Sequence, residues 1–293
     1  MRRACLGPFA APALAVWLAC GGCASVGEQV VLLRGPAAPR RPVGAVKLAT
    51  FNLYNRPWDR EVRLARAREE LLALDADLVA LQEVSEGWLA GRDAKPMLAS
   101  LPYPYQAYFM LERRGPLREN GLYLLSRWPI ETAEGEVYGV NRAFRRKGLM
   151  VATVRAPGVT LRLVNLHQAS TRDSSITLPQ ADAVCRVLSG RPPGELVVVL
   201  GDFNARLDEA PVQRILERAR LIAAQDGEAS PPLSWAPYGR GCAGEEGERI
   251  DHILLSRPGS DQPWRVRSQG VVSAAAPFAS DHCIVWALVG KQD

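Results

Sequence analysis

The sequence has no long hydrophobic run in its main body, no closely spaced pairs of cysteines and no strong charge of either sign. Beyond residue 24 no apolar stretch approaches the roughly 20 residues that a membrane-spanning helix needs, which excludes a polytopic membrane protein. The net charge of +5 is small for 293 residues, so binding to nucleic acid does not follow from charge alone. With 47% hydrophobic and 23% charged residues, the composition is typical of a globular protein and excludes a disordered or collagen-like chain.

Cysteines are also scarce in the main body of the chain: after residue 23, only Cys185, Cys242 and Cys283 occur. None of them lies in a CxxC motif or in a Cys/His spacing typical of a zinc site, which excludes a zinc finger. Two of the three could pair in a disulfide, but we expect Cys185 and Cys283 to be buried as small hydrophobic side chains.

The N-terminal residues 1–23 have the pattern of a cleaved targeting segment, with two early arginines followed by an apolar stretch and small residues. The junction around Cys23 resembles a bacterial lipoprotein signal, in which Cys23 becomes the lipid anchor. Cys20 is the second candidate for that anchor, and an ordinary cleaved signal peptide is the alternative. We therefore expect a lipoprotein of the bacterial cell envelope, attached to a membrane and facing the periplasm or the cell surface.

Residues 24–45 contain three prolines and three arginines without a hydrophobic period, which predicts a linker. Strand and helix patterns alternate after it, as in an α/β layered fold. The predicted helices span residues 60–74, 177–188 and 211–219. The predicted strands span residues 46–52, 77–82, 121–126, 148–155, 161–166, 196–200, 249–255 and 284–289. No boundary signal divides residues 46–290, which we interpret as one domain.

Polar side chains occur at the ends of the most apolar predicted strands. They are Asn52, Glu83, Asn165 with His167, Asp202 with Asn204, and Asp251 with Asp281 and His282. Carboxylate and amide oxygens with few histidines suit Mg²⁺ better than zinc. A metal, a histidine oriented by an aspartate and a carboxylate that positions water are what phosphate ester hydrolysis needs.

The order of these clusters along the chain and their residue patterns resemble the motifs of the endonuclease/exonuclease/phosphatase superfamily. This superfamily includes DNase I-like and exonuclease III-like nucleases, inositol polyphosphate 5-phosphatases and neutral sphingomyelinases. The motifs are Thr50-Phe51-Asn52, Leu81-Gln82-Glu83, Asn165-Leu166-His167, Gly201-Asp202-Phe203-Asn204 and Ser280-Asp281-His282. The resemblance covers about residues 46–290. It implies a four-layer α/β sandwich, with two mixed, mostly antiparallel sheets, outer helices and an active site at one edge.

The resemblance also implies metal ligands and a phosphate-binding lysine. Glu83 is similar to the principal metal ligand, with Asn52 and Asp281 close to the metal, which we expect to be Mg²⁺ or Mn²⁺. Lys147 and Asn165 are expected to contact the substrate phosphate.

The catalytic roles follow from the same resemblance. Asp202 is similar to the carboxylate that orients or deprotonates the attacking water, and Asn204 to the residue that holds that water or the phosphate. His282 resembles the histidine that contacts the scissile phosphate, held by Asp251, and His167 resembles a second donor to the phosphoryl oxygens. His252 stays unassigned, because strand alternation from Asp251 directs it to the opposite face.

The predicted function is divalent-metal-dependent hydrolysis of a phosphodiester or phosphomonoester by a monomeric enzyme. The pair Lys147-Gly148 resembles the phosphatase and sphingomyelinase branches and, with the small net charge, favours a lipid or small-molecule substrate. An exported or membrane-tethered endonuclease acting on DNA or RNA is the alternative, and an inactive phosphate-binding module is a remote one.

Overall fold

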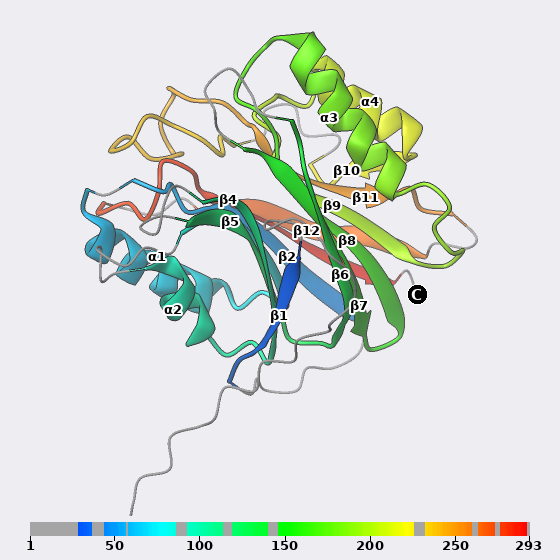
Figure 1. Cartoon of the computed structure of the whole chain (residues 1–293), viewed down its shortest axis with the longest axis horizontal. Coiled ribbons are helices and arrows are strands. Elements are labelled where there is room, and N and C mark those ends of the chain that lie inside the picture. The colour runs from blue at the N-terminus through cyan, green and yellow to red at the C-terminus, as the bar shows by residue number, and fades with distance from the viewer. Residues whose placement is uncertain are drawn as a thin grey trace, which may run out of the picture.

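The computed structural model describes residues 29–36, 44–56, 58–85, 93–113, 119–139, 146–225, 232–259, 263–272 and 276–291. The predicted signal segment, with Cys20 and Cys23, lies outside these residues. In the described part, two β-sheets pack face to face and helices cover their outer faces (Figure 1). This arrangement is the four-layer α/β sandwich that the family resemblance implies.

The first sheet has seven strands among the described residues, in the order β1-β4-β5-β3-β2-β13-β12. Their bounds are β1 (Val30–Arg34), β2 (Ala45–Asn52), β3 (Leu78–Val84), β4 (Tyr105–Arg113), β5 (Glu119–Ser126), β12 (Trp264–Val272) and β13 (Ile284–Lys291). The pair β2 and β3 is parallel, and the other neighbours are antiparallel. The C-terminal strand β13 therefore lies in the interior of the sheet.

The second sheet has six strands in the part of the chain that is described, in the order β10-β11-β9-β8-β7-β6. Their bounds are β6 (Ile130–Val137), β7 (Gly148–Ala156), β8 (Val159–His167), β9 (Leu196–Asp202), β10 (Leu221–Ala223) and β11 (Asp251–Ser256). Here β8 and β9 are the parallel pair. Both sheets are thus mixed and mostly antiparallel, as expected.

The helices α1 (Arg60–Leu74) and α2 (Ala94–Ala99) lie beside the first sheet, and α3 (Ser174–Val187) and α4 (Ala210–Arg218) lie beside the second (Figure 1). In α1, Leu64, Ala67 and Leu71 recur at helical spacing and are buried. The helix ends at Asp75, whose left-handed backbone (φ 53°) cannot continue it. Among the described residues, no helix combines the length and hydrophobicity needed to cross a bilayer.

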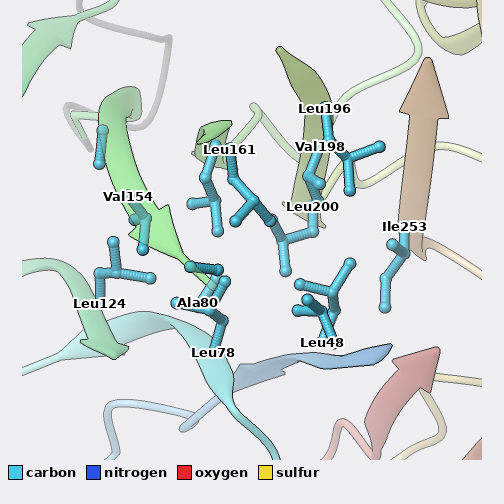
Figure 2. Close-up of a cluster of buried hydrophobic side chains, with 14 of the residues drawn as sticks. Leu48, Leu78, Ala80, Leu124, Val154, Leu161, Leu196, Val198, Leu200 and Ile253 are labelled. Atoms are coloured by element: carbon cyan, nitrogen blue, oxygen red, sulfur yellow. The ribbon is translucent and has the colours of Figure 1, made fainter. Parts of the chain in front are cut away.

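Among the described residues, three hydrophobic cores hold the four layers together. The largest lies between the sheets, where Leu48 and Leu78 of the first sheet face Leu161 and Leu200 of the second (Figure 2). A second core joins the first sheet to α1 and α2, and a third joins the second sheet to α3 and α4. Each fully buried leucine contributes roughly 1.5–3 kcal/mol, so these cores fix how the strand ends of the two sheets meet.

Two expectations differ from the structure. Residues 30–34, predicted to lie in the linker, form β1, because their backbone groups pair with β4 and Val30 and Leu33 pack against the hydrophobic cores. Cys283, expected as an unpaired buried side chain, forms a disulfide with Cys242, 41 residues away, while Cys185 is a free, partly buried cysteine. Spacing alone could not single out that pair.

Candidate active site

The predicted polar residues meet where strand ends of both sheets converge. In the second sheet, Asp202 at the end of β9 is directly paired with His167 of β8 on one side and Asp251 of β11 on the other. In the first sheet, the parallel strands β2 and β3 run side by side and end at Asn52 and next to Glu83. Because parallel neighbours end at the same edge of a sheet, these side chains gather at one place.

Asp202 is the most connected carboxylate of the site. Its Oδ2 accepts a hydrogen bond from Asn52 Nδ2 at 2.9 Å and lies 3.1 Å from His167 Nε2, and its Oδ1 accepts from the Asn204 N–H at 2.9 Å. Burial raises the pKa of Asp202, but the adjacent His167 and His282 outweigh this and hold the pKa far below its usual range. Asp202 is therefore a fixed anion at neutral pH.

Glu83 faces the site because its strand is irregular at that point. The register of β3 against β5 shifts between Leu81 and Val84, and Glu83 has a left-handed backbone with φ 55°. Its Oε2 accepts from the Asn55 N–H at 2.7 Å, and its Oε1 lies 4.0 Å from Lys147 Nζ. Burial raises the pKa of Glu83, but Lys147 and the other surrounding donors leave the pKa below its usual value.

His282 is held in place by a hydrogen-bond chain through Asp251 to Ser234. Its Nδ1 lies 2.8 Å from Asp251 Oδ2, and that oxygen also accepts from Ser234 Oγ at 2.7 Å. Its Nε2 points the other way, 3.8 Å from Asp202 Oδ2. Burial lowers the pKa of His282, but Asp251 and Asp202 raise it to about 10. The ring therefore carries a proton on Nε2 for a bound anion.

His167 and Lys147 form the opposite side of the site. Lys147 precedes β7, directly across from the end of β8, and its Nζ contacts His167 Nε2. Burial and the Lys147 charge lower the pKa of His167, although Asp202 opposes this, so the neutral imidazole is favoured. Both side chains line the same cavity.

The structure places Asn165 apart from the other predicted residues. It is fully buried between the sheets, where its Nδ2 donates to the carbonyls of Leu81 and Tyr123 and its Oδ1 accepts from Gln82 Nε2 at 2.8 Å. Its hydrogen-bonding groups are used within the protein, so it links the two sheets. His252 also lies away from the site, on the opposite face, where it contacts Gln225 and the Ala205 carbonyl.

A cavity of about 350 Å³ opens at this junction. The predicted residues that line it are Asn52, Glu83, Lys147, His167, Asp202, Asn204, Asp281 and His282. Sequence reasoning missed Tyr54, Arg56, Arg172 and Trp235, which line the same cavity from loops. The sequence offered a clue to Tyr54 and Arg56 only, the group of aromatic and basic residues directly after Asn52.

The donors in this cavity fit a divalent cation that prefers oxygen ligands. Glu83, Asp202 and Asp281 provide carboxylates, and Asn52 an amide. Burial raises the pKa of Asp281, His282 opposes this, and the negative charge of Glu83 adds to the rise. Carboxylates that repel each other across a cavity are stabilised by a cation.

A second grouping, Asp202, Asp251 and His282, places one candidate ligand atom from each residue within 4.8 Å of the others. In this grouping Asp251 and His282 already bind each other, which explains their proximity without a metal. Glu83 and Asp281 are therefore the better-placed ligands.

A buried arginine organises the loop that follows β2. Arg63 of α1 is only 2% exposed, and its guanidinium donates to five backbone carbonyls. These belong to Leu53, Tyr54, Arg56, Trp58 and Ala279. Arg63 thereby joins the loop that binds Glu83 to the segment just before Asp281 and His282.

A second loop is attached to the site by covalent and backbone bonds. The disulfide Cys242–Cys283 joins it to the residue after His282, and the Cys283 N–H donates to the Ser234 carbonyl at 2.8 Å. Trp235 of this loop donates from Nε1 to Asp281 Oδ2 at 3.3 Å. The loop therefore forms a fixed wall of the cavity.

This sandwich with a strand-end site of carboxylates, histidines and a lysine is a known class of architecture. The family model described as "Endonuclease/Exonuclease/phosphatase family" matches residues 49–282. The chain therefore belongs to the endonuclease/exonuclease/phosphatase family, whose name covers nucleases and phosphatases, both of which cleave phosphate esters. No curated protein matches the sequence.

Solved structures agree on the fold. Humanized D. rerio TDP2 is 18% identical with a TM-score of 0.63, and the match covers 84% of this chain and 99% of that one. Sphingomyelinase C from Streptomyces griseocarneus is 19% identical with a TM-score of 0.63, covering 85% and 99%. A family protein from Bacteroides vulgatus is 19% identical with a TM-score of 0.66, covering 85% and 99%. At these identities the likeness concerns the fold.

Proposed function

We propose that this protein is a divalent-metal-dependent phosphoesterase that hydrolyses a phosphodiester or phosphomonoester of a lipid or small molecule. The observation that carries the proposal is one cavity whose lining combines the carboxylates of Glu83, Asp202 and Asp281 with the nitrogen-bearing side chains of Lys147, His167 and His282. One half of this set suits a cation and a water molecule, and the other half suits a phosphate group.

The hydrolysis requires attack of water on phosphorus, breakage of the ester P–O bond and transfer of a proton to the leaving alcohol. Asp202, anionic and fixed by Asn52 and Asn204, orients the water. His282 donates from Nε2 to a phosphoryl oxygen, while Asp251 holds its Nδ1. Lys147 adds positive charge where negative charge develops.

Glu83, Asn52 and Asp281 would hold the metal, which we propose is Mg²⁺ or Mn²⁺. When bound, such an ion neutralises phosphoryl oxygens and lowers the pKa of water. The Asn55 N–H on Glu83 fixes that carboxylate in advance.

The small net charge supports a lipid or small phosphoester over duplex nucleic acid. Affinity for a duplex depends on neutralising several phosphates, which requires a larger basic surface. The alternative, an endonuclease, predicts that the protein cleaves nucleic acid and leaves lipid and small phosphoesters intact.

The test is hydrolysis by the purified protein with Mg²⁺ or Mn²⁺. The substrates are bis(4-nitrophenyl) phosphate, sphingomyelin and phospholipid vesicles, inositol phosphates and supercoiled plasmid. We expect EDTA to abolish activity, and Glu83→Ala, Asp202→Ala and His282→Ala each to reduce kcat by about 10²–10⁴. Circular dichroism of each variant controls for folding.

Full activity in a folded His282→Ala variant, or activity indifferent to EDTA, would contradict the mechanism. Strong Mg²⁺-dependent nicking of plasmid that Asp202→Ala abolishes, with every lipid and small ester intact, would replace the proposed substrate by nucleic acid.

A further inference from the structure

Of the described residues, two arginines line the catalytic cavity, Arg56 and Arg172, and only Arg172 has carboxylate partners. Arg172 is neutralised, with Nη1 2.6 Å from Glu209 and Nη2 2.9 Å from Glu248. Within the described part of the chain, no carboxylate oxygen lies within 4.0 Å of the Arg56 guanidinium. An arginine that faces a catalytic cavity without an anionic partner is available to a ligand.

Arg56 is nevertheless held in place. Its Cζ lies 5.8 Å from the ring centroid of Tyr54 and 5.9 Å from that of Trp58, so aromatic rings flank the guanidinium. Its carbonyl accepts from Arg63 Nη2 at 2.6 Å, and its N–H donates to the Tyr54 carbonyl at 2.6 Å. A side chain with a fixed backbone and flanking rings loses less entropy when it binds an anion.

Arg56 is also close to the groups that would act on the scissile phosphate, but separate from them. It directly follows Asn55, whose N–H binds Glu83, and consecutive Cα atoms are about 3.8 Å apart. Lys147 and His167 come from the second sheet, whereas Arg56 follows β2 of the first. A ligand whose scissile phosphate sits against the second sheet can reach Arg56 with a neighbouring group.

We propose that Arg56 binds a second anionic group of the substrate, a phosphate or carboxylate next to the scissile phosphoester. This inference rests on the proposed function and narrows its substrate class. A planar guanidinium pairs with such a group through two parallel hydrogen bonds, and it repels a cationic headgroup such as choline. The enzyme therefore prefers substrates with two neighbouring negative groups over those with one.

The test compares two esters that differ by one phosphate: thymidine 5′-(4-nitrophenyl phosphate) and its 3′-phosphorylated counterpart. We expect the wild-type protein to have a kcat/KM at least about tenfold higher for the phosphorylated ester, as charged hydrogen bonds imply. Arg56→Gln should bring the ratio of the two kcat/KM values close to one, and Arg56→Lys should restore part of it. Arg68→Gln, which removes an exposed charge from α1, is the matched control and should keep the ratio.

Calorimetry separates this inference from the proposed function. The wild-type protein should bind thymidine 3′,5′-bisphosphate about tenfold more tightly than thymidine 5′-monophosphate, and Arg56→Gln should bind both alike. If the protein hydrolyses none of the esters but keeps this binding preference, the proposed function is refuted and the inference that Arg56 binds an anionic group is supported. A wild-type ratio near one, or a ratio that Arg56→Gln does not change, refutes the inference even where turnover is strong.

A soluble substrate and a lipid headgroup present the same anionic chemistry, and vesicles distinguish them. Faster Arg56-dependent hydrolysis of phosphatidylinositol 4-phosphate than of phosphatidylinositol in phosphatidylcholine vesicles supports the site with a lipid substrate. An Arg56-dependent preference confined to the soluble esters supports it with a soluble substrate. Phosphatidylcholine as the best substrate, unaffected by Arg56→Gln, overturns the inference.

Discussion

Replacing Arg63 by lysine tests whether one buried guanidinium organises the loop that follows β2. A lysine ammonium has three N–H donors, whereas Arg63 serves five carbonyls, so at least two carbonyls lose their donor. Each buried carbonyl left unpaired costs about 1–3 kcal/mol, which predicts a loss of about 2–6 kcal/mol in the free energy of unfolding. A domain of ordinary stability, about 5–15 kcal/mol, can survive this loss.

The same substitution should affect function through Glu83. The loop that Arg63 holds carries the Asn55 N–H that fixes Glu83, so a looser loop weakens the proposed metal site. We expect the Mg²⁺ concentration for half-maximal activity to rise about tenfold, since one charged hydrogen bond is at stake. Urea unfolding followed by tryptophan fluorescence measures the stability, and a Mg²⁺ titration of the rate measures the metal site.

Arg66→Lys is the matched control on the same helix. Arg66 pairs with Glu69 and Glu70 near the surface, and lysine keeps the charge, so the change in stability should stay within about 0.5 kcal/mol. Equal stability and equal Mg²⁺ dependence of Arg63→Lys and Arg66→Lys would refute the organising role of Arg63.

Three further predictions concern other parts of the molecule. Burial lowers the pKa of His252 to about 4 from 6.5, so the unfolded chain binds a proton that the folded chain resists. Stability should therefore fall by about 3 kcal/mol as the pH drops from about 6.5 to about 4, measured by urea unfolding; an equally steep fall in His252→Gln would contradict this. Removing the disulfide, by reductant or by the double change Cys242→Ser and Cys283→Ser, should lower the free energy of unfolding by about 2–4 kcal/mol, because the bond closes a loop of 41 residues in sequence separation. A melting temperature unchanged by either treatment would contradict this prediction. In a Gram-negative host, radioactive fatty acid should label the wild-type protein and not Cys23→Ala; labelling lost only in Cys20→Ala would move the anchor, and none in the wild type would indicate a protein without a lipid.

The fold followed from the sequence where strands are buried on both faces. The predicted helix at residues 60–74 matches α1, and continuous apolar runs marked β3 and β9. The strands β1, β4, β6, β10 and β12 and the short helix α2 were missed, β4 although most of it is buried. In β6 and β12, polar residues interrupt the apolar pattern because much of each strand is exposed. Such edge strands are specified by backbone pairing with a neighbour, which a single segment does not reveal.

The sequence predicted the site residues that lie at strand ends. It predicted less well the roles of residues inside strands and in loops. Asn165 and His167 lie on the same face of β8, but two residues of strand place Asn165 roughly 7 Å deeper, among buried partners. The role of Arg63 depends in part on Ala279, 216 residues away, and that of Trp235 on Asp281. Contacts between loops that distant carry no local pattern, so only the folded chain reveals them.

The interior position of β13 has a consequence for how the protein is made. A ribosome would release β2, β3 and the whole second sheet before β13, the last described strand, which pairs with both β2 and β12. Until it emerges, β2 has an open edge, and His282, just before β13, is missing from the site. The nascent protein therefore cannot complete the first sheet or the site before residues 282–291 emerge, and a stop codon before Ile284 would remove a middle strand of that sheet.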